Sequence, residues 1–216
     1  MSELLPLFLN LTGRAVVLVG GGPVATAKLR QLLAAGADVR VIAPAITDEI
    51  AGISAITVER RPFEPSDLDA AWLVVAAATS SVNRQVADAA ERRRIFVNAV
   101  DDPANASAFL SGVVRRDGVT LAISTRGAAP ALTALLREGL DALLPRDLAG
   151  WMWQARSSRA AWRRDGVPMD ARKPRLLQAL NELYDRGTSA HAVSAIAGAE
   201  RGPRVPWLNA PEDSWL

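Results

Sequence analysis

Cysteine is absent from this sequence of 216 residues, and histidine occurs once, at His191. The lack of cysteine excludes disulfide bonds, zinc ribbons, iron–sulfur clusters and catalysis by a thiol. With one histidine, a permanent metal site built from histidine and cysteine is excluded as well. Any metal ion that the protein handles is therefore expected to bind transiently, through oxygen atoms or through atoms of a substrate.

Long apolar runs are also lacking. The longest, residues 4–11 and 72–78, are far shorter than the roughly 20 residues of a membrane-spanning helix. The first residues include the acidic Glu3 and also Pro6, and they lack the basic stretch and apolar core of a secretion signal. We therefore expect a cytoplasmic protein with no membrane partner.

Neither sign of charge is in large excess, because the formal net charge at pH 7 is +2. A charge this small does not predict nucleic-acid binding. The basic residues are unevenly spread, however. Residues 151–175 contain seven basic residues and two acidic ones, Asp165 and Asp170. This segment is either a solvated helix face or a surface for an anionic partner, and the sequence leaves both open. Its basic residues are Arg156, Arg159, Arg163, Arg164, Arg172, Lys173 and Arg175.

Half of the residues are apolar, as in folded globular proteins, and short apolar runs alternate with helical patterns. Continuous apolar runs predict strands that are buried on both faces of a parallel sheet. Their alternation with helices predicts the α/β class with a doubly wound parallel sheet. Strands are expected at residues 14–20, 39–43, 56–59, 72–78 and 95–100, and helices at 23–35 and 82–93.

The pattern changes after the last of these strands. Two segments, 108–114 and 119–124, flank an Asp-Gly pair, which indicates a hairpin. A helix is expected at 130–144, with its leucines on one face. That face must be covered, and a second subunit is a candidate. Two helices should follow, at about 147–164 and 174–186, before an Ala-, Gly- and Pro-rich tail, 187–216, that is a candidate for mobility.

The run Gly20-Gly-Gly-Pro-Val-Ala25 matches the pattern G-x-G-x-x-A, directly after a strand and at the start of a helix. Gly20 permits the tight turn, Gly22 leaves room for a pyrophosphate, and Ala25 lets helix and strand pack closely. The helix N-terminus supplies N–H groups and partial positive charge for phosphates. The pattern therefore predicts dinucleotide binding, against the alternative of a glycine-rich turn without a ligand.

The acidic residue that holds a ribose hydroxyl at the end of the second strand is missing, since residues 42–45 read Ile-Ala-Pro-Ala. The choice between NAD and NADP is therefore open at this level. Arg40 could meet a 2′-phosphate, but strand alternation leaves its direction undetermined.

Two polar segments are candidates for the chemistry. Asp101 follows the last sheet strand, where ligands of open α/β sheets bind, and its carboxylate could act as a general base. Alternatively, Asp101 or Asp102 caps a turn before a proline. Ser124, Thr125 and Arg126 precede a helix and suit a carboxylate or phosphate, although they could simply begin that helix.

Five motifs in this order resemble the precorrin-2 dehydrogenase family, whose members are stand-alone enzymes or the N-terminal modules of sirohaem synthases. They are Leu5-Pro-Leu-Phe8, the glycine run, Ala76-Ala-Ala-Thr79 with Val82-Asn83, Phe96-Val-Asn-Ala-Val-Asp-Asp-Pro103 and Ala122-Ile-Ser-Thr-Arg-Gly-Ala-Ala-Pro130. The resemblance covers residues 4–144. It implies oxidation of precorrin-2, a polycarboxylate tetrapyrrole, to sirohydrochlorin with NAD+, followed in some members by insertion of ferrous iron.

The resemblance also implies an organisation and a set of site residues. It implies a homodimer with a Rossmann-type NAD-binding domain at 1–112, a dimerisation region at 113–146 and a small C-terminal helical domain at 147–186. Asp101 matches the essential aspartate of the family, and Thr125 or Ser124 falls where some members carry a regulatory serine. The implied cofactor contacts are Gly20, Gly22, Pro23, Val24, Ala43, Pro44, Ala45 and Thr79, and the implied substrate contacts are Asn98, Ser124, Thr125 and Arg126.

Two residues depart from the family pattern, which usually has a second glycine at Arg126 and often a proline near Ser111. Arginines would nevertheless suit a substrate with many carboxylates. Two other functions remain open: a non-catalytic NAD-sensing module whose basic helices bind a partner, and a dehydrogenase for another polyanion. The first would not need Asp101.

Overall fold

The computed structural model describes residues 3–110 and 112–195 of the chain. They divide into two compact units. Unit 1 comprises the described residues up to Arg115 with Thr120–Leu143, and unit 2 comprises Arg116–Val119 with the described residues from Leu144 to Ala195. In the described part, no helix is both long and apolar enough to cross a membrane.

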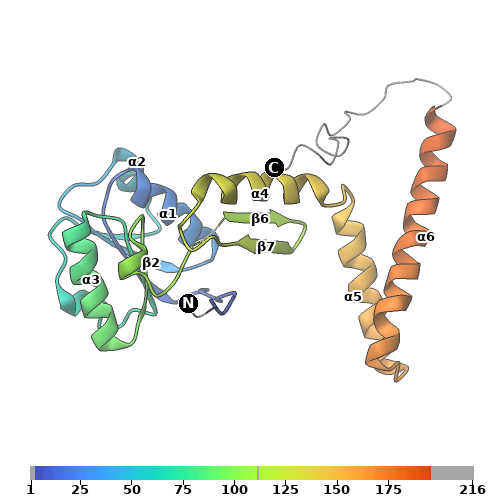
Figure 1. Ribbon diagram of the computed structural model, residues 1–216, viewed down its shortest axis with the longest axis horizontal. Coiled ribbons are helices and arrows are strands. Elements are labelled where there is room, and N and C mark those ends of the chain that lie inside the picture. Colours follow the sequence, from blue (N-terminus) through green and yellow to red (C-terminus); the bar gives the residue numbers. More distant parts are fainter. Residues whose placement is uncertain (1–2, 111, 196–216) are drawn as a thin grey trace. The chain divides into compact units, whose positions relative to one another are not determined.

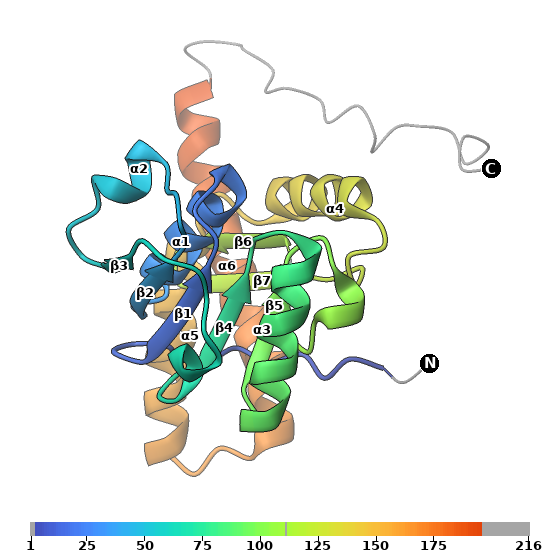
Figure 2. The same cartoon turned by 90° about the vertical axis from the view of Figure 1, so that its left-hand side faces the viewer.

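Unit 1 is built on a five-stranded parallel sheet with the order β3-β2-β1-β4-β5 (Figure 2). The chain runs from β1 outward to β3 and then returns to β4 on the other side of β1. The expected doubly wound sheet is thus confirmed, and the order reverses between β1 and β4, where such folds bind ligands. The strands are β1 (Ala15–Val19), β2 (Asp38–Ile42), β3 (Thr57–Glu59), β4 (Leu73–Ala76) and β5 (Phe96–Ala99).

Helices cover both faces of this sheet, as continuously apolar strands require. Helix α1 (Pro23–Ala34) packs on one face, where Leu29 joins a cluster with Leu18 and Val75. Helix α3 (Ser80–Arg93) packs on the other face through Val86. The sequence did not indicate the short helix α2 (Asp48–Ala51) or the 3-10 turns η1 (Pro65–Leu68) and η2 (Pro103–Asn105).

The predicted hairpin is present as β6 (Gly112–Arg116) and β7 (Val119–Ile123) (Figure 1). Its turn residues Asp117 and Gly118 have φ of 49° and 83°, the left-handed geometry that a two-residue hairpin turn requires. The expectation that the first strand begins at residue 108 was wrong. The amide of Ala108 instead bonds the carbonyl oxygen of Val97 in β5, at 2.9 Å.

Helix α4 (Pro130–Leu143) follows, at the expected place, but none of its residues is buried in the single chain. Its leucines stand out from unit 1, with exposed fractions of 65% for Leu135 and 59% for Leu143. The apolar face that the sequence indicated therefore has no cover within the described residues.

Unit 2 contains α5 (Leu148–Arg164) and α6 (Met169–Ala195), which pack against each other (Figure 1). Helix α6 was expected to begin at about Pro174. It begins five residues earlier, and Pro174 lies inside it. The helix also continues through residues 187–195 of the segment expected as a tail, and the remaining residues 196–216 lie outside the described part.

Candidate functional site

The turn between β1 and α1 admits glycine alone at its first two positions. Gly20 has φ of 122°, and a Cβ there would lie 2.2 Å from the carbonyl oxygen of Ala77. A Cβ on Gly21 would lie 2.1 Å from the carbonyl oxygen of Ala45. A Cβ on Gly22 would meet nothing within 4 Å. Gly22 therefore borders open space, which is where a pyrophosphate would approach the backbone.

The N-terminus of α1 has amides available for an anion. Gly22 is the N-cap and provides no side-chain cap, and Pro23 has no N–H group. The amide of Thr26 bonds the carbonyl oxygen of Gly22 at 3.0 Å. The amides of Val24 and Ala25 precede the first carbonyl that the helix can offer them. This donor set fits a phosphate group.

The loop after β2 is fastened to the glycine turn. The amide of Thr47 bonds the carbonyl oxygen of Gly21 at 2.9 Å, and its hydroxyl lies 3.0 Å from that of Thr26. Ala43 is buried, whereas Pro44 and Ala45 are exposed. An exposed loop held beside a phosphate site is suited to the adenosine part of a dinucleotide.

Arg40 is engaged in an ion network. Its Nη1 donates to Oε1 of Glu59 at 3.1 Å, and its Nη2 donates to the carbonyl oxygen of Asp67. Its neighbours Val39 and Val41 face the α1 side of the sheet, so Arg40 faces the α3 side. Its guanidinium is thus already bound by protein groups.

A second cleft, of about 430 Å³, lies where β5 ends, within unit 1. Four of the predicted site residues line it: Asn98, Asp101, Ser124 and Thr125. The predicted Arg126 and Thr79 are not among the described residues that line it. Thr79 is the N-cap of α3. The lining also includes a lysine from α1 that the sequence did not indicate. The polar residues that matter below are Lys28, Asn98, Asp101, Ser124, Thr125 and Thr133.

Asn98 carries a buried acceptor without a partner. The side chain is 6% exposed, and its Nδ2 donates to the carbonyl oxygen of Ala108 at 2.9 Å. Its Oδ1 has no hydrogen bond from the described residues. A buried acceptor left unpaired costs free energy. Because Asn98 lines the cleft, an N–H or O–H group of a ligand would satisfy it.

The two aspartates after β5 have different positions. Asp102 accepts a hydrogen bond from Nδ2 of Asn105 at 2.8 Å and so stabilises the following turn. Asp101 is exposed and has φ of 55°, a left-handed conformation that is strained for a residue other than glycine and recurs at functional sites. Both aspartates line the cleft, but the hydrogen bond that stabilises the turn belongs to Asp102, while Asp101 has no hydrogen bond from the described residues.

Lys28 is the functional candidate that sequence reasoning missed. It is half-buried, and this burial lowers the pKa of its ammonium group, while the negative charge of Asp101 raises that pKa in part. A sign of its role was present in the sequence, because Lys28 shares a helix face with Ala25, Leu29 and Leu32, which are buried. A lysine on the buried face of a helix is uncommon without a partner.

The segment before α4 forms one wall of the cleft and also begins the helix. The hydroxyl of Thr125 accepts a hydrogen bond from the amide of Ala129 at 3.3 Å and lies 2.9 Å from that of Thr133. The hydroxyl of Ser124 accepts from the amide of Arg126 at 3.2 Å. Arg126 has φ of 55°, a conformation that suits the glycine expected there.

Comparison with known proteins places these features in context. The family model described as "Putative NAD(P)-binding" matches residues 7–112. Siroheme synthase 3 of Aeromonas hydrophila is 41% identical over 199 residues, which are 88% of this chain and 42% of that protein. Siroheme synthase of Citrobacter koseri is 40% identical over 173 residues, 78% of this chain and 38% of that protein. The chain thus spans less than half the length of these relatives.

A solved structure agrees with these matches. The protein described as SirC, precorrin-2 dehydrogenase, superposes with a TM-score of 0.63 and is 26% identical. The match covers 81% of this chain and 88% of the other.

Proposed function

The chain belongs to the precorrin-2 dehydrogenase family, and on that premise we propose that it oxidises precorrin-2 to sirohydrochlorin with NAD+. One observation carries the proposal. The exposed carboxylate of Asp101 shares a cleft with the unpaired Oδ1 of Asn98 and the half-buried ammonium of Lys28, at the carboxyl end of β5. A base, an acceptor and a cation are the groups needed to deprotonate and hold a tetrapyrrole with N–H groups and carboxylates.

The cofactor site is the glycine turn with the loop that follows β2. The amides of Val24 and Ala25 would hold the pyrophosphate, and residues 43–45 would lie along the adenosine. When bound, the nicotinamide ring supplies an acceptor for hydride. The engagement of Arg40 with Glu59 and Asp67 supports NAD over NADP, because that arginine is not available for a 2′-phosphate.

Asp101 is the proposed catalytic base. Oxidation of precorrin-2 removes two electrons and two protons, of which one proton leaves with the electrons as hydride. The carboxylate of Asp101 takes the other proton. Its position in the cleft, with no hydrogen-bond partner among the described residues, leaves both oxygen atoms accessible to substrate.

The neighbouring polar groups hold the substrate in this proposal. The ammonium of Lys28 pairs with a substrate carboxylate, and Oδ1 of Asn98 accepts a hydrogen bond from a pyrrole N–H. The hydroxyls of Ser124 and Thr125 border the same space and donate to further carboxylates. Charge-assisted bonds of this kind are stronger than neutral ones.

Insertion of ferrous iron into the product is a second reaction proposed for this cleft. The part of the chain that the structure describes has no cluster of histidine, cysteine and acidic residues that could hold a metal ion. The macrocycle nitrogens would therefore ligate the iron, while Asp101 accepts the two displaced pyrrole protons one after the other and passes each to solvent.

The test is conversion of precorrin-2 by the purified full chain, under anaerobic conditions and followed by absorbance, with NAD+ or NADP+. We expect turnover that is faster with NAD+, and a decrease of about 10²-fold or more in kcat for Asp101→Asn. Asp88→Asn, which changes an exposed aspartate on α3, is the matched control and should turn over normally. Ferrous iron is then added to the product to test insertion.

Two outcomes would contradict the proposal: no turnover with either cofactor, or an Asp101→Asn variant that is as active as the unchanged protein. Binding of NADH by Asp101→Asn, measured by fluorescence, separates loss of the base from loss of the fold.

A further inference from the structure

The two helices of unit 2 are joined by a turn that fixes their geometry at one end. Helix α5 ends at Arg164, and Gly166 follows with φ of 66°. The amide of Val167 bonds the carbonyl oxygen of Trp162 at 2.9 Å, which is the long bond of a Schellman motif. Val167 itself is buried, so the start of α6 is held against the end of α5.

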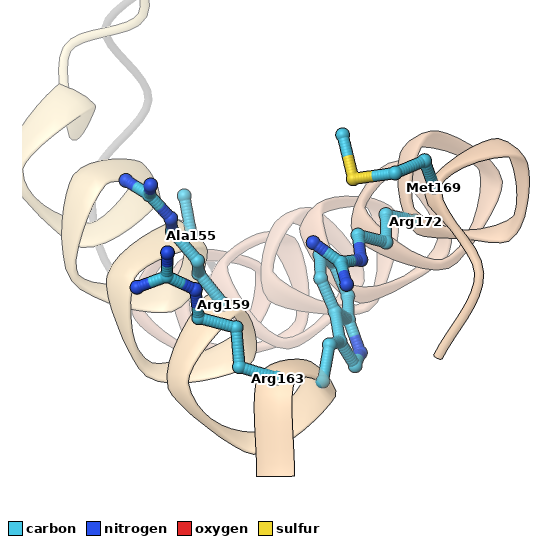
Figure 3. A pocket seen from close by; sticks show the side chains of 6 residues that line it. Ala155, Arg159, Arg163, Met169 and Arg172 are labelled. Atoms are coloured by element: carbon cyan, nitrogen blue, oxygen red, sulfur yellow. The ribbon is translucent and has the colours of Figure 1, made fainter. Parts of the chain in front are cut away.

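This turn brings a stripe of α5 opposite the first turns of α6. Ala155, Arg159, Trp162 and Arg163 recur at helical spacing and share one face of α5. Together with Met169 and Arg172 of α6 they line a cleft of about 490 Å³ (Figure 3). This volume is within the range of about 300–1,000 Å³ that small-molecule sites occupy.

The cleft is cationic and has an apolar surface. Its described lining includes three arginines and no carboxylate. Figure 3 shows the side chains of Arg159 and Arg163 together on one side and Arg172 on the other. The Nε of Arg172 donates to the carbonyl oxygen of Val167 at 3.0 Å, which orients that guanidinium and leaves its terminal nitrogens for a ligand.

The neighbouring Arg164 differs from the arginines of the cleft because it has an ion pair. Arg164 is on another face of α5, and its Nε pairs with Oδ1 of Asp165 at 2.9 Å. No such ion pair occurs for Arg159 or Arg163 among the described residues. Guanidinium groups without an ion pair among the described residues, on both sides of a cleft, are suited to forked recognition of carboxylates, while the indole of Trp162 offers a face for a flat ring.

We propose that the α5–α6 cleft is a binding site for a flat organic polycarboxylate, held by Arg159, Arg163 and Arg172 and stacked on Trp162. The tetrapyrrole is the ligand of this class that the protein would meet, and this identification rests on the proposed function. A nucleic acid fits less well, because the described lining groups three cations in one short cleft and does not form an extended basic track.

The experiment titrates the full chain into uroporphyrin, a stable aromatic porphyrin with carboxylates around its rim, and follows porphyrin fluorescence. Every protein in this titration, the reference included, carries Lys28→Met, which weakens the cleft at the end of β5, so that the signal reports on the α5–α6 cleft. The double variant Arg159→Gln with Arg163→Gln should bind about tenfold more weakly, which corresponds to about 1.4 kcal/mol. Trp162→Leu should also weaken binding. Arg164→Gln removes one charge from the same helix outside the cleft, and its affinity should stay within about twofold of the unchanged protein.

Three results would overturn the proposal. The double variant could bind as tightly as the unchanged protein, Arg164→Gln could lose as much affinity as the double variant, or a cationic porphyrin or a single-stranded oligonucleotide could bind the cleft better than uroporphyrin. The proposed function is judged separately by turnover of precorrin-2. If the protein turns over precorrin-2 but the double variant keeps its porphyrin affinity, only this inference is rejected. If the double variant loses porphyrin affinity but the protein does not turn over precorrin-2, only the proposed dehydrogenase activity is rejected.

Discussion

Gly20 and Gly22 stand two residues apart in one turn, yet only Gly20 is required by the fold. A Cβ on Gly20 would lie 2.2 Å from the carbonyl oxygen of Ala77, and the residue has φ of 122°. Gly22 has φ of −83° and open space around its Cβ position. The structural reason for a glycine at position 22 therefore lies in a ligand rather than in the protein.

Gly22→Ala should accordingly separate binding from stability. The methyl group would occupy the space proposed for the pyrophosphate, so NADH affinity should decrease by about tenfold or more, which is 1.4 kcal/mol. The melting temperature should change by no more than about 2 °C, since the substitution causes no clash. Gly20→Ala is the matched variant and should lower the melting temperature strongly. Unchanged NADH affinity in Gly22→Ala would contradict the pyrophosphate position.

Lys28→Met should raise the KM for precorrin-2 by about tenfold with a smaller effect on kcat, because it removes a charge that binds a substrate carboxylate. Lys28→Arg should restore much of the affinity. Arg30→Met, on the same helix but exposed and paired with Glu49, is the control. An unchanged KM in Lys28→Met would remove Lys28 from the site.

The pH dependence offers a separate check on Lys28. Burial lowers the pKa of this lysine, with a partial opposing effect from Asp101. The ammonium is therefore lost at a lower pH than that of an exposed lysine, and kcat/KM should decline on the alkaline side as it is lost. Lys28→Met should lack that decline, and Lys28→Arg should shift it to higher pH because arginine stays charged.

The sequence predicted those parts of the molecule whose structure depends on residues close together in the chain. Continuous apolar runs require burial on both faces, and Gly20 requires its turn, so the sheet and the first helix could be placed. Asn98 and Asp101 could be assigned to a sheet edge for the same reason. The direction of Arg40 and the approach of Lys28 to Asp101 depend on how separate elements pack, and no local pattern encodes that.

Two element boundaries differed from the sequence prediction for different reasons. Residues 108–110 have strand-like composition, yet the amide of Ala108 and the side chain of Asn98 bond this segment to β5. Pro174 suggested a helix start, but the turn at Gly166 begins α6 earlier. A long-range contact therefore ends the strand-like segment, whereas a turn local in sequence sets the start of α6.

Asp67 should contribute strongly to stability. Its side chain is 4% exposed and accepts hydrogen bonds from Arg61 at 2.9 Å and from the amide of Glu64 at 2.8 Å. Asp67→Ala should lower the free energy of unfolding by about 2 kcal/mol, less than the 3–5 kcal/mol of a fully buried pair because Arg61 is partly exposed. Asp69→Ala breaks an exposed pair with Arg93 and should cost less than about 1 kcal/mol. Urea unfolding measures both.

This contribution should depend on pH. Burial alone would raise the pKa of Asp67, but the hydrogen bonds from Arg61 and Glu64 outweigh it and lower that pKa below the ordinary value of 3.8. The stabilisation is therefore complete above pH 3.8 and is lost as the pH falls through the lowered pKa of the folded state. The difference between the unchanged protein and Asp67→Ala should shrink on acidification, and a difference that grows would contradict the assignment.

The leucine face of α4 leads to the last prediction, a homodimer. Leu132, Leu135 and Leu136 are 43–65% exposed in the single chain, and a contiguous apolar face of this kind marks an interface. We propose that a second copy covers it, as the family resemblance implies. Sedimentation velocity at micromolar concentration should give a dimer, and Leu135→Glu with Leu136→Glu should give a folded monomer, because each glutamate would place a charge in the interface. Leu177→Glu, at an exposed leucine of α6, is the control and should stay dimeric. A monomeric unchanged protein, or a double variant that stays dimeric, would show that this face has another role.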